Sequence, residues 1–161
     1  MFNLKAEFYL KIIFLFSFIA LISAFFIEYI LGHQPCNLCL IERIPYGLSI
    51  MIIMAIFLIR KNQKFLVMLL ILTFVFSFAI SFYHFGIEQG FFQESSVCGL
   101  KGSTEIVTKE DLLKQLSEKT ISCKDVTFRI FGLSLTSINI VISLMFIITL
   151  LKIFKKYEKN K

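Results

Sequence analysis

The sequence is short of polar residues. Of its 161 residues, 57% are hydrophobic and only 17% are charged, and there are 20 phenylalanines but no tryptophan. Soluble domains are about 45–50% apolar, so this composition excludes an ordinary soluble domain. The sequence also lacks internal repeats and low-complexity tracts. We therefore expect one small membrane domain with no second globular unit.

Four apolar runs are long enough to cross a bilayer, which takes about 20 mostly apolar residues. They cover approximately residues 12–31, 40–59, 65–85 and 130–152. The first run has no good small-x-small cleavage site after it, and it is longer than the apolar part of a signal peptide, which is about 7–15 residues. We therefore expect all four runs to be retained. The prediction is an all-α membrane protein, a bundle of four transmembrane helices forming a single domain over residues 1–161.

The positive charges are unevenly distributed along the chain. If both termini and the turn Arg60–Lys64 lie on one side, that side carries 10 Lys or Arg against two acids, net +8, and the other carries 7 against 9, net −2. An excess of Lys and Arg around short loops marks the cytoplasmic side. Both termini are thus expected inside, with residues 32–39 and 86–129 outside. The basic character indicates orientation, and no nucleic-acid partner is expected.

The second outer loop, residues 86–129, contains a helix signal. Thr108-Lys109-Glu110-Asp111 resembles a capping box with Asp in place of Glu or Gln. Leucines follow it at helical spacing, at positions 112, 113 and 116. The pattern predicts a short interfacial helix near residues 109–118.

None of the four cysteines lies in the middle of a predicted span or in the cytoplasmic turn: they are Cys36, Cys39, Cys98 and Cys123. All four are therefore expected at the outer face, where disulfides form and persist. Four cysteines in an oxidising compartment indicate two disulfides, and the spacing favours 36–39 and 98–123. A zinc site of four cysteines is the alternative. Because Cys98 and Cys123 are not a close pair, no metal site is expected.

Cys36-Asn37-Leu38-Cys39 stands at the start of the second apolar run, directly after Pro35. Proline is favoured at the first position of a helix, and a helix beginning there would place Cys36, Cys39 and Arg43 on one face. A helix N-terminus and a guanidinium both favour a thiolate over a thiol. The alternative is a static disulfide that braces the helix start, although so small a loop gives little entropic stabilisation.

A few polar residues within the apolar runs have both a structural and a functional interpretation. Arg43 either extends to the headgroups or stabilises a thiolate or a reduced cofactor. Glu28 is either interfacial or takes part in proton uptake. His84 either forms a local hydrogen bond or moves a proton. Thr136 and Asn139 are typical of residues that join membrane helices.

The chain resembles the disulfide bond formation protein B (DsbB) family, the bacterial inner-membrane proteins that reoxidise the periplasmic thiol oxidase DsbA with a quinone. Electron flow from DsbA through DsbB to quinone keeps the bacterial periplasm oxidising. The matching residues run nearly end to end: Pro35-Cys36-x-x-Cys39-x-x-Glu42-Arg43, Tyr83-His84, Cys98, Cys123 and Phe131-Gly132-Leu133-Ser134-Leu135.

The resemblance implies a role for each cysteine. Cys98 would form the mixed disulfide with a reduced DsbA-like, thioredoxin-fold partner in the periplasm. Cys123 would exchange with Cys36. Cys39 would face the quinone and form a thiolate charge-transfer or adduct state with it. The cysteines would be periplasmic and the protein a monomer in the inner membrane.

The resemblance also implies that Arg43, with His84 and Glu42, helps to bind or activate the quinone, and ubiquinone is expected rather than menaquinone.

Two alternatives to this function remain. One is a relative of vitamin K epoxide reductase, but in that family the loop cysteines precede the Cys-x-x-Cys, whereas here they follow it. The other is a membrane protein without enzymatic activity, whose disulfides only brace its outer loops.

Overall fold

The computed structural model describes residues 4–59, 62–93, 123, 129–130 and 133–159. In these residues the chain forms four long helices: α1 Leu4–Tyr29, α2 Asn37–Leu58, α3 Gln63–Glu88 and α5 Leu135–Lys159. Two-residue strands β1 Arg129–Ile130 and β2 Leu133–Ser134 pair antiparallel just before α5, with Arg129 opposite Ser134. The described chain is otherwise helical, so the predicted all-α architecture is confirmed.

Each helix is long and apolar enough to cross a membrane. The four candidate spans are 22 to 26 residues long and have a mean hydropathy between 1.7 and 2.7. The centre of each predicted apolar run falls inside one of these helices. The predicted interfacial helix near residues 109–118 lies outside the described residues.

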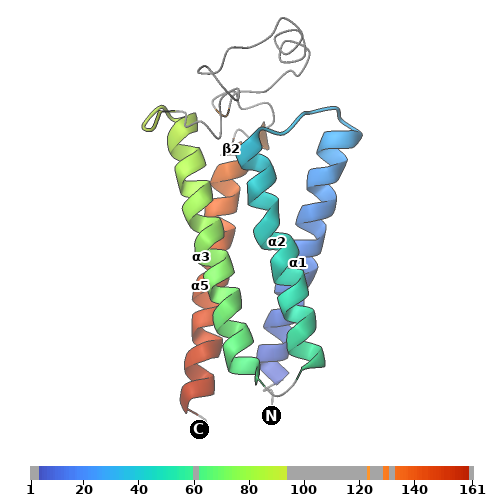
Figure 1. Ribbon diagram of the computed structural model, residues 1–161, viewed down its shortest axis with the longest axis vertical. Helices are drawn as coiled ribbons and strands as arrows, with labels where there is room; N and C mark the ends of the chain where they lie inside the picture. The colour runs from blue at the N-terminus through green and yellow to red at the C-terminus, as the bar shows by residue number, and fades with distance from the viewer. Residues whose placement is uncertain (1–3, 60–61, 94–122, 124–128, 131–132, 160–161) are drawn as a thin grey trace, which may run out of the picture.

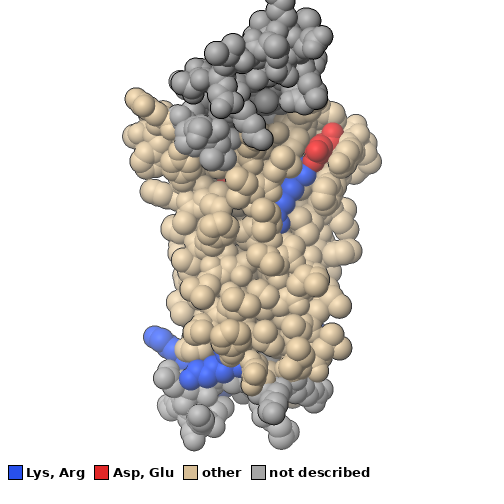
Figure 2. Space-filling view, in the orientation of Figure 1, with Lys and Arg blue, Asp and Glu red and all other residues tan. Residues whose placement is uncertain are grey.

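The helices form an upright bundle in which α1 begins and α5 ends at the same end (Figure 1). α3 packs most extensively against α5 and then against α2, whereas α1 packs against α2 and makes few direct contacts with α5. On the face shown in Figure 2, Lys and Arg gather at the end where α5 finishes, and a broad uncharged surface separates them from an acidic and basic pair near the other end.

The main core lies in the half of the bundle near the termini. Phe74 is fully buried there, with its ring edge-on to Phe146 at 5.0 Å and to Tyr46 at 6.4 Å between centroids. Small polar residues join the helices: Ser49 donates a hydrogen bond to Ser17 at 2.9 Å, linking α2 to α1. Small side chains let membrane helices approach closely, so this half of the bundle is tightly packed and the site lies in the other half.

Candidate functional site

The structure places Cys36 immediately before α2 rather than inside it. The helix begins at Asn37, and Cys36 is the N-cap, in an extended conformation with φ −71° and ψ 167°. Its Sγ accepts a hydrogen bond from the backbone N–H of Cys39 at 3.3 Å, which satisfies one of the amides that a helix start leaves unpaired. A helix start near Pro35 was expected, and the helix begins two residues after it. The sulfur takes the position that a Ser or Asp oxygen usually holds.

The two sulfurs of the Cys-x-x-Cys pair lie 2.8 Å apart. Cys36 is buried and Cys39 is half-buried. The hydrogen bond from the Cys39 thiol, together with a contact to His84, lowers the pKa of Cys36 to about 4, although burial acts in the opposite direction. When the reduced pair loses one proton, the negative charge is therefore held on Cys36. The geometry suits thiol–disulfide exchange, in which a thiolate attacks or leaves.

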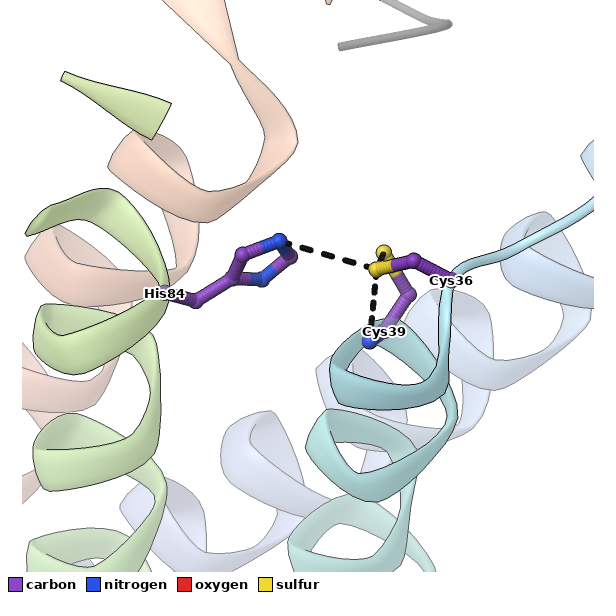
Figure 3. A group of neighbouring side chains, drawn as sticks. All are labelled: Cys36, Cys39 and His84. Carbon is purple, nitrogen blue, oxygen red and sulfur yellow. Dashed lines mark hydrogen bonds between the residues drawn. The ribbon is translucent and has the colours of Figure 1, made fainter. Parts of the chain in front are cut away.

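His84 reaches this pair from α3. Its Nε2 lies 3.6 Å from Cys36 Sγ, and its Nδ1 lies 3.0 Å from Glu42 Oε1. Figure 3 shows the imidazole of His84 pointing from α3 across to the two sulfurs at the start of α2. The side chain is 2% exposed. The structure thus brings four of the predicted site residues together: Cys36, Cys39, Glu42 and His84.

A buried hydrogen-bond network continues from Glu42 into α5. Asn139 Nδ2 donates to Glu42 Oε2 at 3.3 Å and to Ser81 at 2.7 Å, and Asn139 Oδ1 accepts a hydrogen bond from the Tyr46 hydroxyl. The sequence had indicated only a helix-joining role for Asn139, and it had not singled out Tyr46 or Ser81. Polar residues inside otherwise apolar helices are the only signal that could have marked them, since their partners lie on other helices.

Glu88, on the last turn of α3, is a third residue that the sequence did not single out. Its Oε1 accepts a hydrogen bond from Thr136 at 2.7 Å and lies 3.9 Å from His84 Nε2. The side chain is 6% exposed, and its Oε2 has no hydrogen-bond partner among the residues that the structure describes. His84 is therefore flanked by two carboxyl groups, the half-buried one of Glu42 from α2 and the buried one of Glu88 from its own helix.

Arg43 lies on the α1 side of α2. Its guanidinium forms an ion pair with Glu28 of α1 and lies over the ring of Phe25, 5.3 Å from the centroid. The sequence had given no sign that Arg43 and Glu28 pair with each other. Half-buried ion pairs of this kind orient the guanidinium, and here its direction is toward a cavity.

The cavity has a volume of about 280 Å³ and lies between α1, α2 and α5. Apolar side chains make up most of its wall. Its polar lining includes Cys39, Glu42 and Arg43 from α2, Asn139 from α5, and His33 from the segment before α2, whereas Cys36 is not among the lining residues. The two cysteines therefore differ in environment: Cys39 meets the cavity, and Cys36 faces His84.

Cys123 is buried, and it belongs to a small cluster with Cys36, Leu38 and Ile87. A residue of the second outer loop is thus packed beside the Cys-x-x-Cys pair, on the Cys36 side. Cys98 lies outside the described residues, and so the predicted 98–123 disulfide is not described either.

Comparison with known proteins agrees with this arrangement. The family model "Disulfide bond formation protein DsbB" matches residues 6–153. The chain is also 33% identical, over 151 residues, to the uncharacterized protein RP370 of Rickettsia prowazekii (strain Madrid E); the match covers 90% of this chain and 86% of that relative. No solved structure matches significantly.

The family match covers all four helices and the Cys-x-x-Cys pair. Members of this family are multi-pass proteins of the inner membrane that act in disulfide formation as thiol oxidoreductases. The chain belongs to the DsbB family of disulfide bond formation proteins.

Proposed function

We propose that the protein oxidises the thiols of a periplasmic DsbA-like, thioredoxin-fold protein and passes the electrons to a membrane quinone. The observation that carries the proposal is the position of Cys39, which belongs to a close pair of sulfurs and lines a mostly apolar cavity inside the bundle. A sulfur that is close to a second sulfur on one side and to an apolar cavity on the other can exchange disulfides and meet a lipid-soluble oxidant.

The residues around the cavity fit a quinone ring. A volume of about 280 Å³ is near the lower end of ligand cavities, which are about 300–1,000 Å³. The apolar wall suits the ring, while the Arg43 guanidinium is a hydrogen-bond donor that suits a carbonyl oxygen. When bound, a quinone accepts two electrons and two protons and becomes a quinol.

The remaining chemistry belongs to the chain itself. In the proposed sequence, the partner's dithiol reduces the Cys98–Cys123 disulfide, and the freed Cys123 thiolate attacks Cys36 of the Cys36–Cys39 disulfide. That attack forms a Cys36–Cys123 bond and breaks the Cys36–Cys39 bond, so Cys39 is released as a thiolate at the cavity wall. The position of Cys123 in the cluster around Cys36 supports this order.

Resolution of the Cys36–Cys123 bond by Cys98 returns a dithiol at Cys36 and Cys39. Two electrons then leave that dithiol as its disulfide re-forms, and two protons accompany them. His84 supports these steps because its Nε2 contacts Cys36 Sγ at 3.6 Å and can donate a hydrogen bond to a thiolate there. Glu42 holds the imidazole through Nδ1.

The proposed orientation has both termini in the cytoplasm and the cysteines in the periplasm. The uneven distribution of charge supports it, since Lys and Arg gather at the end of the bundle remote from the Cys-x-x-Cys pair (Figures 1 and 2). A periplasmic position would place the pair where disulfides persist.

The experiment that tests the proposal is quinone reduction by the purified protein with a reduced DsbA-like partner, followed by quinone absorbance. Ubiquinone is the expected acceptor, and menaquinone is compared in parallel. Cys39→Ser should abolish quinone reduction with any reductant. Cys98→Ser should abolish it with the protein partner but retain it with a small dithiol. Full activity of Cys39→Ser, or disulfides that quinone cannot re-form after reduction, would contradict the proposal.

A further inference from the structure

Three atoms of the kinds that bind soft and borderline metal ions converge at the start of α2. Cys36 Sγ, Cys39 Sγ and one ring nitrogen of His84 all lie within 4.8 Å of one another, and Figure 3 shows the imidazole directed at the sulfurs. Thiolate sulfur and imidazole nitrogen are the ligands that Zn²⁺ prefers, in tetrahedral sites with Cys-x-x-Cys spacing. The two cysteines come from one helix start and the histidine from another helix, as in a closed metal site.

The orientation of His84 is that of a metal ligand. Its Nδ1 lies 3.0 Å from Glu42 Oε1, so the carboxylate accepts a hydrogen bond from Nδ1–H. The other ring nitrogen, Nε2, then faces the sulfurs. Metal-binding histidines almost always donate their second ring N–H to a carboxylate or carbonyl, which fixes the tautomer and the ring plane. Glu42 is itself held by Asn139 at 3.3 Å.

Glu88 offers a fourth donor. Its Oε1 lies 3.9 Å from His84 Nε2, the side chain is 6% exposed, and its Oε2 has no hydrogen-bond partner within the described part of the chain. An unpaired buried carboxylate oxygen is costly, and coordination to a cation would remove that cost. The ligand atoms of Cys36, Cys39 and His84 lie within 4.8 Å of one another, and Glu88 stands outside that group, next to His84, as the nearest carboxylate for the fourth position of a tetrahedral zinc site.

We propose that the reduced form of this site binds one Zn²⁺ ion, or a thiophilic cation of the same class, through Cys36, Cys39 and His84, with Glu88 as the nearest carboxylate for a fourth ligand. Each sulfur that is still protonated loses its proton to solvent as its metal–sulfur bond forms, and no electrons move. Zn–S bonds of about 2.3 Å hold two sulfurs about 3.8 Å apart, so the sulfurs must separate from their present 2.8 Å. Rotation of the Cys36 side chain allows this, because Cys36 precedes the helix.

Metal binding and disulfide formation exclude each other at this site. A disulfide joins its sulfurs at about 2.05 Å and leaves no thiolate to coordinate a cation. A zinc site of four cysteines is disfavoured because Cys98 and Cys123 are not a close pair. The donors here are instead two cysteines, a histidine and a carboxylate. On the proposed function, the metal would hold the dithiol in its reduced state and stop quinone reduction until a chelator removes it.

The test uses the full-length protein in detergent, reduced and freed of metal, with Cd²⁺ as the probe. One equivalent of Cd²⁺ should produce a thiolate-to-metal charge-transfer absorption, and Zn²⁺ should displace it. The same protein with its Cys36–Cys39 disulfide formed should show no such absorption, and this comparison needs no substitution. Cys98→Ser/Cys123→Ser should bind as the wild type does, since the loop cysteines are not ligands.

Single variants locate the ligands. Cys36→Ser and Cys39→Ser should lose the charge-transfer band, and Glu88→Gln should weaken Zn²⁺ binding while it keeps the Thr136 hydrogen bond. Glu42→Gln should weaken binding about 10- to 100-fold, as expected for a residue that orients a ligand. His33→Gln is the matched control for His84→Gln: the first should leave the affinity for Zn²⁺ unchanged and the second should reduce it.

Three results would overturn the inference: no binding by the folded, reduced wild type, equal binding by its oxidised form, or loss of binding in Cys98→Ser/Cys123→Ser. Quinone reduction by the metal-free protein is measured separately. A protein that reduces quinone but binds no metal contradicts only this inference. One that binds metal but reduces no quinone contradicts only the proposed function.

Discussion

His84 and Cys36 are 48 residues apart in the sequence, yet Nε2 of the first lies 3.6 Å from Sγ of the second. The contact joins the C-terminal end of α3 to the residue that caps α2. It also places the imidazole on Cys36 rather than on Cys39, so the two sulfurs of one motif have different surroundings. Their acidity and their exchange chemistry should differ accordingly.

The first prediction concerns the acidity of Cys36. In reduced, chelator-treated Cys98→Ser/Cys123→Ser protein, one thiolate should form with a midpoint near pH 4, well below the usual cysteine value of about 8.5. The hydrogen bond from Cys39 and the His84 contact are the physical cause. Thiolate absorbance against pH measures it. His84→Ala should move the midpoint upward, and an ordinary midpoint in the parent protein would refute the assignment.

The lowered pKa also predicts how the stability of the reduced protein depends on pH. Because the folded-state pKa lies below the unfolded one, the contribution of Cys36 is fully present above the unfolded value and is lost as the pH falls through about 4. The reduced protein should therefore gain stability relative to the oxidised protein as the pH rises between these two values. Thermal unfolding of both forms across that range checks the sign.

Arg43→Ala should raise the apparent KM for quinone or lower the rate, because the guanidinium lines the cavity. Arg43→Lys keeps the charge but loses the planar group, and it should fall between the wild type and the alanine variant. Glu28→Gln removes the negative charge that pairs with Arg43, so it should leave the guanidinium less firmly oriented at the cavity. Unchanged quinone kinetics in Arg43→Ala would reduce the residue to an interfacial anchor.

Phe74→Ala should destabilise the bundle by about 3–5 kcal/mol, the usual cost of removing a buried phenylalanine side chain. Phe74 is fully buried between Tyr46 and Phe146. Phe76, on the same helix, is 52% exposed, so Phe76→Ala is the matched control and should cost much less. Thermal unfolding in one detergent compares them, and equal losses would mean that the core is not where the structure places it.

Asn139→Leu should destabilise the protein and slow quinone reduction together. The change removes the hydrogen bonds to Glu42, Ser81 and Tyr46, and a buried polar group left without its partner costs about 1–3 kcal/mol. Thr149→Val provides a control, because Thr149 hydrogen-bonds only within its own helix, to Met145. If Asn139→Leu behaved like that control, the network would have no role in holding Glu42.

The sequence predicted the four helices because a long apolar run has few structural alternatives in a membrane. It also predicted Cys36 and Cys39 as a pair, since their spacing is local. It could not show that His84 contacts Cys36, or that Arg43 pairs with Glu28, because those contacts depend on how helices pack against one another. Glu88 was missed for the same reason: near the end of an apolar run, a carboxyl group looks interfacial until the packing buries it.

The helix start expected near Pro35 falls at Asn37, because Cys36 rather than Pro35 takes the capping position. A cysteine is an uncommon cap, and no rule of local sequence favours it over proline at the first position. The outcome matters for the chemistry, since the capping sulfur contacts a backbone amide in the first turn of the helix as well as His84.

The scarcity of contacts between α1 and α5 has a consequence for selectivity. The cavity lies between these two helices and is open at its edge rather than enclosed, so a ligand with a long tail can place its ring against Cys39 and leave the tail among the lipids. On the proposed function, such a cavity should select an acceptor by its ring, and the length of the chain attached to that ring should matter little.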